Sequence, residues 1–388
     1  MAVWDELTGQ ADAIAIVEAA ASASAVGGSG DSSMTHSWLI TGPPGSGRSN
    51  LAYAFATALL GTGDTEADAA TARQVAARTH PDLGVLSTDR VIISIEEVRQ
   101  LVATSQFSPS VGRYRVMIIE DADRMAERTS NVLLKALEEP PPRTVWILCA
   151  PSEADLIPTI RSRVRTVRLR VPDIAEVAAL LERRDGVDAA TATRAAREAQ
   201  SHIGMAHRLA TNAEALQRRE RTLELALGIR SVSGAVLAAA ALLELAKADA
   251  EAITQERDSE ERDSAMRSLG IEPGGTIPPA LRAQLRNLED DQKRRATRSL
   301  RDGIDRIMVD LLSLYRDILL DQLGATLEPI NLRIIEQLRA ASAASNPVET
   351  LATMDAIATA RERIESNVPP ALALEAMLVT AIRSGRNQ

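Results

Sequence analysis

A glycine-rich stretch at residues 42–49 carries the first sign of chemistry in this chain. It reads Gly-Pro-Pro-Gly-Ser-Gly-Arg-Ser and stands between an apolar run at 38–40 and a helical pattern that begins near Leu51. Its glycine spacing matches G-x-x-x-x-G-K-[ST], in which backbone N–H groups and a helix N-terminus cradle phosphates. The pattern requires lysine where this chain has Arg48. Because arginine is a planar fork and lysine a compact point charge, the exchange argues against hydrolysis.

The loop itself keeps the residues that contact phosphate in such sites. We assign the degenerate phosphate loop to Gly42, Gly45, Gly47, Arg48 and Ser49. Two states of the loop stay open. Its backbone N–H groups can hold a phosphate, a sulfate, ATP or ADP, or Arg48 can fold into the loop and fill it. We favour a site that is empty or holds an anion, and we expect no required cofactor. Lysine occurs only at positions 135, 247 and 293, so Arg48 can also reflect a general arginine bias.

An acidic pair follows the apolar run at 116–119, as the metal-binding and water-polarising carboxylates of an ATPase follow a buried strand. Here the order is Glu120 then Asp121, the reverse of the usual Asp then Glu. Moving a carboxylate by one methylene displaces it beyond what catalytic geometry tolerates. We therefore interpret Glu120 and Asp121 as a degenerate acidic pair. The alternative is a strand end with solvated acids.

Two arginines, Arg161 and Arg163, stand just before the apolar run at 167–169. An arginine at the edge of a nucleotide-binding domain can stabilise the phosphate of a neighbouring subunit, as an arginine finger does. Arg163, with Ser162 beside it, is the candidate for this role. From spacing alone, an ordinary solvated arginine is the better interpretation.

The composition limits the remaining function classes. The chain has 388 residues, of which 2% are aromatic. Its net charge of −9 argues against binding of nucleic acid through the overall charge of the protein. Its one cysteine, Cys149, lies in an apolar run and excludes an internal disulfide and a cysteine-cluster metal site. The first residues lack the basic start of a signal peptide, and the apolar run at 235–243 is too short to cross a bilayer. We expect a soluble protein of the reducing cytoplasm.

The order of the apolar runs predicts an α/β fold followed by helices. Between residues 36 and 170, short continuous apolar runs alternate with helical stretches, which is typical of a parallel sheet covered on both faces. These runs lie at 38–40, 83–86, 116–119, 145–149 and 167–169. A helix is also expected over 1–20. After Pro172 the pattern is helical, with Asp173 placed to cap a helix and a glycine- and proline-rich break at 270–279.

Several motifs together resemble the clamp-loader branch of the AAA+ ATPases, that of bacterial DNA polymerase III. They are the run at 133–141, which ends Glu-Glu-Pro-Pro, the pair Ser162-Arg163, and the runs at 35–38 and 79–82. The resemblance covers residues 1–210 by motif and the rest by architecture. It implies a RecA-like AAA+ domain with a parallel sheet at 1–170, a small helical lid domain at 171–212 and an all-α collar (oligomerisation) domain at 213–388.

Within this branch, ATP-hydrolysing gamma/tau motor subunits differ from the delta-prime subunit, a stator. Four motor features are lost here: the loop lysine is Arg48, the acidic pair is reversed, the polar sensor falls on Ala150 or Pro151, and the lid arginine falls on Gly204. The resemblance therefore implies a delta-prime-type stator without ATPase activity of its own, whose Arg163 acts in trans. It also implies a cytoplasmic, replisome-associated pentameric ring with gamma/tau and delta subunits, which acts on the sliding clamp and primer-template DNA.

The resemblance also bears on zinc. Relatives usually carry four zinc-binding cysteines in the stretch that matches residues 61–78, and this chain has none there. We therefore expect no metal and no zinc.

Two other functions stay open at this point. One is an active ATPase motor in which Arg48 substitutes for lysine. The other is a stand-alone nucleic-acid-binding protein that uses a basic cluster on one helix. Acidic residues at 289–291 share that helix, which favours a solvated face instead. The cluster comprises Lys293, Arg294, Arg295, Arg298 and Arg301.

Overall fold

The computed structural model describes residue 4 and residues 7–25, 34–62, 65–88, 92–268 and 282–384. The chain divides into two compact units, Met1–Thr211 and Asn212–Gln388. This division separates the helical region from the rest, and it draws no line between the α/β part and the lid. The predicted lid boundary at 170/171 therefore stays a prediction. None of the described helices combines the length and the apolar composition needed to cross a membrane.

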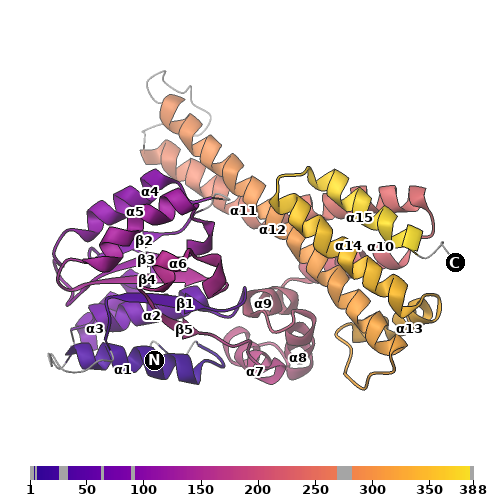
Figure 1. Ribbon diagram of the computed structural model, residues 1–388, viewed down its shortest axis with the longest axis horizontal. Helices are drawn as coiled ribbons and strands as arrows, with labels where there is room; N and C mark the ends of the chain where they lie inside the picture. Colours follow the sequence, from indigo (N-terminus) through magenta and orange to yellow (C-terminus); the bar gives the residue numbers. More distant parts are fainter. Residues whose placement is uncertain are drawn as a thin grey trace. The chain divides into compact units, whose positions relative to one another are not determined.

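The first unit is built on one parallel sheet of five strands in the order β2-β3-β4-β1-β5 (Figure 1). The strands are β1 (Ser37–Thr41), β2 (Leu83–Leu86), β3 (Arg115–Ile119), β4 (Thr144–Ala150) and β5 (Arg165–Arg168). All five predicted strands are present, which confirms the α/β fold class. β5 begins two residues earlier and ends one residue earlier than its apolar run predicts.

Both faces of the sheet are covered, and for this reason its strands read as continuous apolar runs. Along β3, Val116 and Ile118 pack into one core while Met117 and Ile119 pack into the other. The first core is formed with α1 (Ala11–Ala25), α2 (Arg48–Leu60) and α3 (Thr65–Ala76). The second is formed with α4 (Ile95–Ser105), α5 (Glu127–Glu138) and α6 (Pro158–Arg161).

The first helix differs from the prediction of a helix over 1–20. Gly9 has a φ of 73°, a left-handed conformation that ends regular structure, and α1 starts only after it. The helix then continues to Ala25, because Ala20 and Ala21 are buried against the sheet side of the unit. Residues 26–33 lie outside the described residues.

Three short helices complete the first unit. They are α7 (Ile174–Asp185), α8 (Ala189–Glu198) and α9 (Ile203–Thr211). Asp173 caps α7 as expected, in a capping box with Glu176 whose carboxylate accepts from the Asp173 backbone N–H at 2.8 Å.

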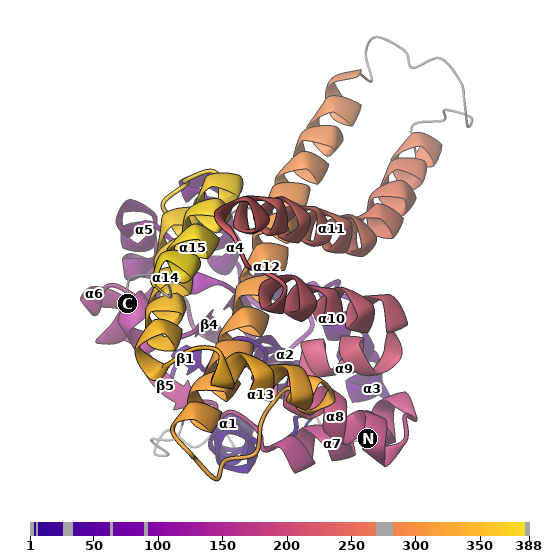
Figure 2. The ribbon, with the colours of Figure 1, turned by 90° about the vertical axis from the view of Figure 1, so that its right-hand side faces the viewer.

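The second unit is helical, and its described residues contain no strand. Its helices are α10 (Ala213–Leu227), α11 (Val232–Ser268), α12 (Arg282–Gln322), α13 (Ile335–Ala343), α14 (Pro347–Glu365) and α15 (Pro370–Ser384). α11 packs against α12 and α15 (Figure 2). The apolar side of α12, with Ile304, Met308 and Leu311 buried, forms the core of this unit. The predicted break at 270–279 lies outside the described residues.

Candidate functional site

The phosphate loop lies at the carboxyl edge of the sheet, directly after β1. In the sheet, β1 lies between β4 and β5. After β1 the chain crosses to β2 on one side, and after β4 it crosses to β5 on the other side, so the connections reverse direction at β1 and β4. Ligands of open α/β sheets bind in the crevice at such a point. Gly45 and Gly47 have φ values of 79° and 92°, which non-glycine residues rarely adopt, and Gly47 is the N-cap of α2. The two glycines thus have the backbone conformations that the loop pattern requires, and binding of a phosphate there stays a prediction.

Arg48 folds back onto this loop. Its Nη1 donates to the carbonyl oxygen of Gly42, the first residue of the loop, at 2.9 Å. Which of the two states the loop adopts stays a prediction. The N–H of Gly42 in turn donates to the carbonyl of Pro151, and the N–H of Ser46 to that of Pro43. The Ser46 side chain is buried, and its hydroxyl oxygen has no hydrogen-bond partner in the structure. Two backbone N–H groups of the loop, those of Gly42 and Ser46, therefore already donate to carbonyl oxygens of this chain.

The lid helices supply a histidine that sequence analysis did not single out. A methyl group built on Gly45 would lie 2.3–2.4 Å from the imidazole atoms of His202, so the ring packs directly on the loop backbone. His202 precedes α9, and its Nδ1 accepts from the Met205 N–H at 3.2 Å. Gly204, the position of the missing lid arginine, stands two residues further along the chain. The motif comparison led to that position, and nothing in the sequence distinguished His202 from its neighbours.

Glu120 is engaged by two side chains of its own domain. The hydroxyl of Tyr53, on α2, donates to its carboxylate, and Nη2 of Arg78 lies 2.8 Å from it. The Arg78 guanidinium also stacks over the Tyr53 ring, 5.3 Å from its centroid. Burial, and then the hydrogen bond to Glu120, raise the pKa of Tyr53, so the phenol stays a donor. Both contacts are made to the same carboxylate oxygen, Oε1.

Asp121 and Cys149 complete the carboxyl edge. Asp121 lies 3.8 Å from the guanidinium of Arg124. Cys149 is fully buried on β4, as expected, and burial raises the pKa of its thiol to about 12. The loop follows β1 and the acidic pair follows β3, and β4 with Cys149 lies between these two strands, so both motifs lie at the same edge of the sheet.

Metal-binding geometry is not found in the part of the chain that the structure describes, which contains no group of three or more His, Cys, Asp or Glu side chains placed to hold an ion. The expectation of no zinc stays a prediction. In the stretch that corresponds to the zinc module, α3 packs against α2 through the buried Val75, and the Asp68 carboxylate accepts from the Thr62 N–H at 2.7 Å.

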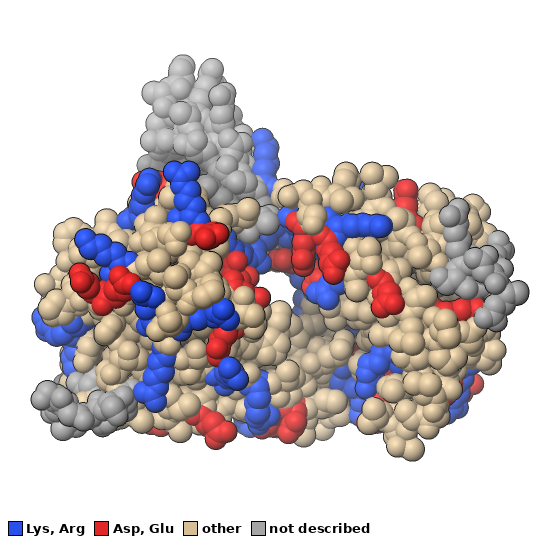
Figure 3. Space-filling model, viewed as in Figure 1, with Lys and Arg blue, Asp and Glu red and all other residues tan. Residues whose placement is uncertain are grey.

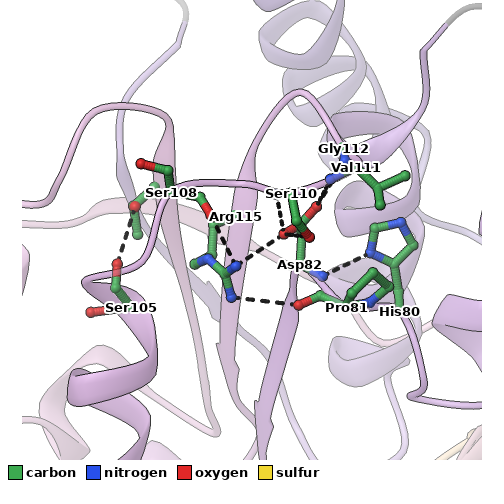
Figure 4. Close-up of polar contacts among 10 residues, drawn as sticks. His80, Pro81, Asp82, Ser105, Ser108, Ser110, Val111, Gly112 and Arg115 are labelled. Carbon is green, nitrogen blue, oxygen red and sulfur yellow. Dashed lines mark hydrogen bonds and ion pairs between the residues drawn. The ribbon is translucent and has the colours of Figure 1, made fainter.

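The opposite, amino edge of the sheet holds a buried polar cluster around Asp82 (Figure 4). Its carboxylate accepts from the backbone N–H groups of Ser110, Val111 and Gly112 at 2.7–2.8 Å and pairs with Arg115 at 3.0 Å. Burial raises the pKa of Asp82, but these hydrogen bonds outweigh burial and leave the pKa below its usual value. His80, also buried, accepts from the Asp82 N–H through Nδ1. The run at 79–82 is thus structural: it fixes the loop before β3.

Arg163 lies at the same amino edge. Its Nε donates to the Glu138 carboxylate at 2.6 Å, and its Nη2 pairs with the same oxygen. Its Nη1 donates to the Thr159 carbonyl at 2.8 Å and to the Ser162 hydroxyl at 3.0 Å. The side chain is one-third exposed and lines an open pocket of about 480 Å³ together with His36, Leu137, Glu138 and Ser162. Ser162 thus contributes by positioning Arg163.

The strand register separates Arg163 from the chain's own phosphate loop. β5 runs parallel to β1 with Arg165 opposite Trp38, so Arg163 is level with His36. Six residues separate His36 from Gly42, which at about 3.3 Å per residue is roughly 20 Å along the strand direction. An arginine side chain is too short to bridge that distance. Arg163 therefore cannot act on a nucleotide in its own loop.

Comparison with known proteins finds a family that part of the first unit resembles. Residues 28–173 match the family model described as DNA polymerase III, delta subunit. The chain is 36% identical over 134 residues to DNA polymerase III subunit delta' of Pseudomonas aeruginosa, covering 33% of this chain and 41% of that protein. It is 32% identical over 146 residues to the delta' subunit of Yersinia pestis, covering 36% of this chain and 43% of that protein. The matched part spans about two fifths of the length of these relatives.

Further matches have lower sequence identity. Subunit gamma/tau of Mycobacterium tuberculosis is 28% identical over 155 residues, covering 39% of this chain and 27% of that protein. Among solved structures, a gamma subunit-related protein of Thermotoga maritima is 19% identical with a TM-score of 0.38, covering 90% of this chain and 95% of that chain. The Thermotoga maritima RuvB Holliday junction branch migration motor is 17% identical with a TM-score of 0.40, covering 71% and 88%. Over residues 28–173, the chain is thus similar to the delta subunit family of DNA polymerase III and to delta' subunits, as its motifs indicate.

Proposed function

We propose that this chain is the delta-prime-type stator of a bacterial DNA polymerase III clamp loader. In this role it hydrolyses no ATP and supplies Arg163 to the ATP site of an adjacent gamma/tau-type subunit. The names of the relatives support a complex with such subunits. The proposal extends to a delta subunit, a pentameric ring, a sliding clamp, primer-template DNA and a cytoplasmic, replisome-associated location.

The position of Arg163 carries the proposal. The arginine is partly exposed beside an open pocket, at the edge of the sheet opposite to its own phosphate loop. An arginine finger must reach a phosphate held by another element, and only a neighbouring chain offers one at that edge. At the carboxyl edge, Arg48 is bonded to Gly42 and Glu120 to Tyr53 and Arg78. The partly exposed Arg163 at one edge, and the internally bonded Arg48 and Glu120 at the other, support a subunit that acts on the ATP of a neighbour and hydrolyses none of its own.

The nature of any ligand in the chain's own loop is part of the proposal. The positive-φ glycines and the unpartnered Ser46 hydroxyl support binding of a small anion such as phosphate or sulfate. Stacking of His202 on Gly45 argues against a full ATP there. We propose a site that is empty or holds an anion, with no required cofactor.

The alternatives find no specific support among the described residues. In the basic cluster, Arg298 lies 3.8 Å from Asp302 and Arg301 donates to Asn367 at 2.6 Å, so these cations are engaged within the second unit. On the face drawn in Figure 3, Lys and Arg side chains lie among Asp and Glu side chains instead of forming one continuous basic patch. ATP turnover by the isolated chain that disappears in Arg48→Ala would favour the motor instead.

The test is Arg163→Ala in a clamp loader reconstituted with gamma/tau-type and delta subunits. Arginine fingers are worth roughly 10³–10⁵ in rate at a single site. Since one of several ATP sites loses its finger, we expect the clamp- and DNA-stimulated ATPase rate of the assembly to fall about twofold or more. Ring assembly, followed by size-exclusion chromatography, should be unchanged. Arg161→Ala, an exposed arginine two residues away, is the matched control. An unchanged ATPase rate in Arg163→Ala would rule out the proposed role.

A further inference from the structure

The end of α5 supplies the strongest acceptor on Arg163. Glu138 is the last residue of α5, and one of its carboxylate oxygens faces both Nε and Nη2 of the guanidinium. The remaining nitrogen, Nη1, donates to the Thr159 carbonyl and the Ser162 hydroxyl at the end of α6. All three guanidinium nitrogens are thus engaged within this chain.

This arrangement is incompatible with bidentate binding of a phosphate. A guanidinium grips a phosphate through two parallel N–H donors, from Nε and Nη2 or from both Nη groups. Glu138 occupies the first pair, and the α6 acceptors occupy Nη1 of the second. A phosphate bound through two donors must therefore displace either Glu138 or the α6 acceptors on Nη1. Its negative charge is also repelled by the carboxylate while Glu138 remains in place.

We propose that Glu138 is a positioning residue that restrains Arg163. It holds the arginine in a docked state, from which the arginine leaves only when the phosphate of a neighbouring subunit replaces the Glu138 carboxylate. The proposal rests on the proposed function, in which Arg163 serves that phosphate. It assigns the first Glu of the Glu-Glu-Pro-Pro run a role that neither its sequence pattern nor its helix position specifies.

The restraint is modest, because both partners are partly exposed: the Arg163 side chain is 33% and the Glu138 side chain 44% exposed. Exposed ion pairs of this kind bias an equilibrium by about fivefold at most. Such a bias suits a group that must be released in every ATP cycle, since a buried pair would hold the arginine too tightly.

The experiment compares Glu138→Gln with wild type in the reconstituted clamp loader, without clamp and DNA and with them. Glutamine keeps an oxygen acceptor but removes the charge, so the docked state weakens. We expect the unstimulated ATPase rate to rise about two- to fivefold and the KM for ATP to fall by a similar factor, while the stimulated kcat changes little. Glu139→Gln, the exposed neighbour with no contact to Arg163 in the structure, should leave both unchanged.

A double variant separates this proposal from the one on which it rests. In Arg163→Ala/Glu138→Gln, the rise should disappear, because the effect of Glu138 acts through Arg163. If the unstimulated ATPase rate of Glu138→Gln equals that of wild type or lies below it, the proposed restraint is wrong. This holds even if Arg163→Ala lowers the stimulated ATPase rate. A rise that persists in the double variant would also overturn it. A silent Arg163→Ala would overturn the proposed function itself.

Discussion

The two edges of the parallel sheet differ in what their polar side chains face. At the carboxyl edge, where such folds place their ligands, Arg48 bonds to its own loop and Glu120 to Tyr53 and Arg78. At the amino edge, Arg163 borders an open pocket beside Glu138, while the Asp82 side chain, at the other end of the strand order, is completely buried. The side chains of the loop edge are therefore bonded inside the domain, while the arginine that we propose to act on a partner borders an open pocket at the other edge.

The largest effect is expected at the amino edge, from Asp82→Asn. The Asp82 side chain is completely buried, and it joins Arg115 to the backbone of residues 110–112. Removing its charge leaves Arg115 buried without a counter-ion and weakens three hydrogen bonds. We expect a loss of about 3–5 kcal/mol in the free energy of unfolding, measured by urea denaturation. Asp188→Asn, an exposed helix cap that asparagine satisfies equally well, should cost less than about 0.5 kcal/mol. Equal stabilities of the two variants would contradict the structural role.

The same cluster predicts a pH dependence. The pKa of Asp82 in the folded protein lies below its ordinary value of 3.8, so its stabilising effect is complete above that value and is lost as the pH falls through the folded pKa. Burial also lowers the pKa of His80 below 6.5; its neutral form is stabilising, and that contribution declines as the pH falls below 6.5. Urea midpoints measured from pH 7 to pH 3 should fall for wild type. Below pH 4 the midpoints of Asp82→Asn should change less steeply, and a parallel course would contradict the assignment.

A smaller effect is expected at the carboxyl edge, from Gly45→Ala. Alanine at a φ of 79° is strained, and its methyl group would collide with the His202 ring. We expect a loss of about 1–3 kcal/mol in the free energy of unfolding. Gly186→Ala is the control for strain alone, because Gly186 has a φ of 66° with open space around it, so it should cost about 1 kcal/mol. His202→Ala should restore part of the stability of Gly45→Ala and none of that of Gly186→Ala. Absence of this rescue would show that the ring does not rest on the loop.

The strands of the sheet could be predicted from the sequence, but the side-chain contacts of the candidate site residues could not. Apolar runs predicted every strand because burial on both faces removes the need for alternation. β5 was misplaced by one or two residues because it is an edge strand that begins and ends in arginine, and the exposed Arg165 covers the Trp38 ring. The partners of the candidate site residues are remote in sequence: His202 with Gly45, Tyr53 with Glu120, and Glu138 with Arg163. Such pairs depend on chain packing, which no local pattern encodes.

The smallest effect is expected from Arg48→Ala. It removes one hydrogen bond to the Gly42 carbonyl, so we expect a loss of about 1 kcal/mol in the free energy of unfolding. The stimulated ATPase rate of the reconstituted clamp loader should change less than in Arg163→Ala. Restoring the lysine in Arg48→Lys should yield no turnover by the isolated chain, since Glu120 stays bound to Tyr53 and Arg78 and Ala150 offers no polar side chain at the end of β4. If Arg48→Ala cripples the assembly while Arg163→Ala is silent, then the carboxyl edge is the working edge and the contrast between the two edges is reversed.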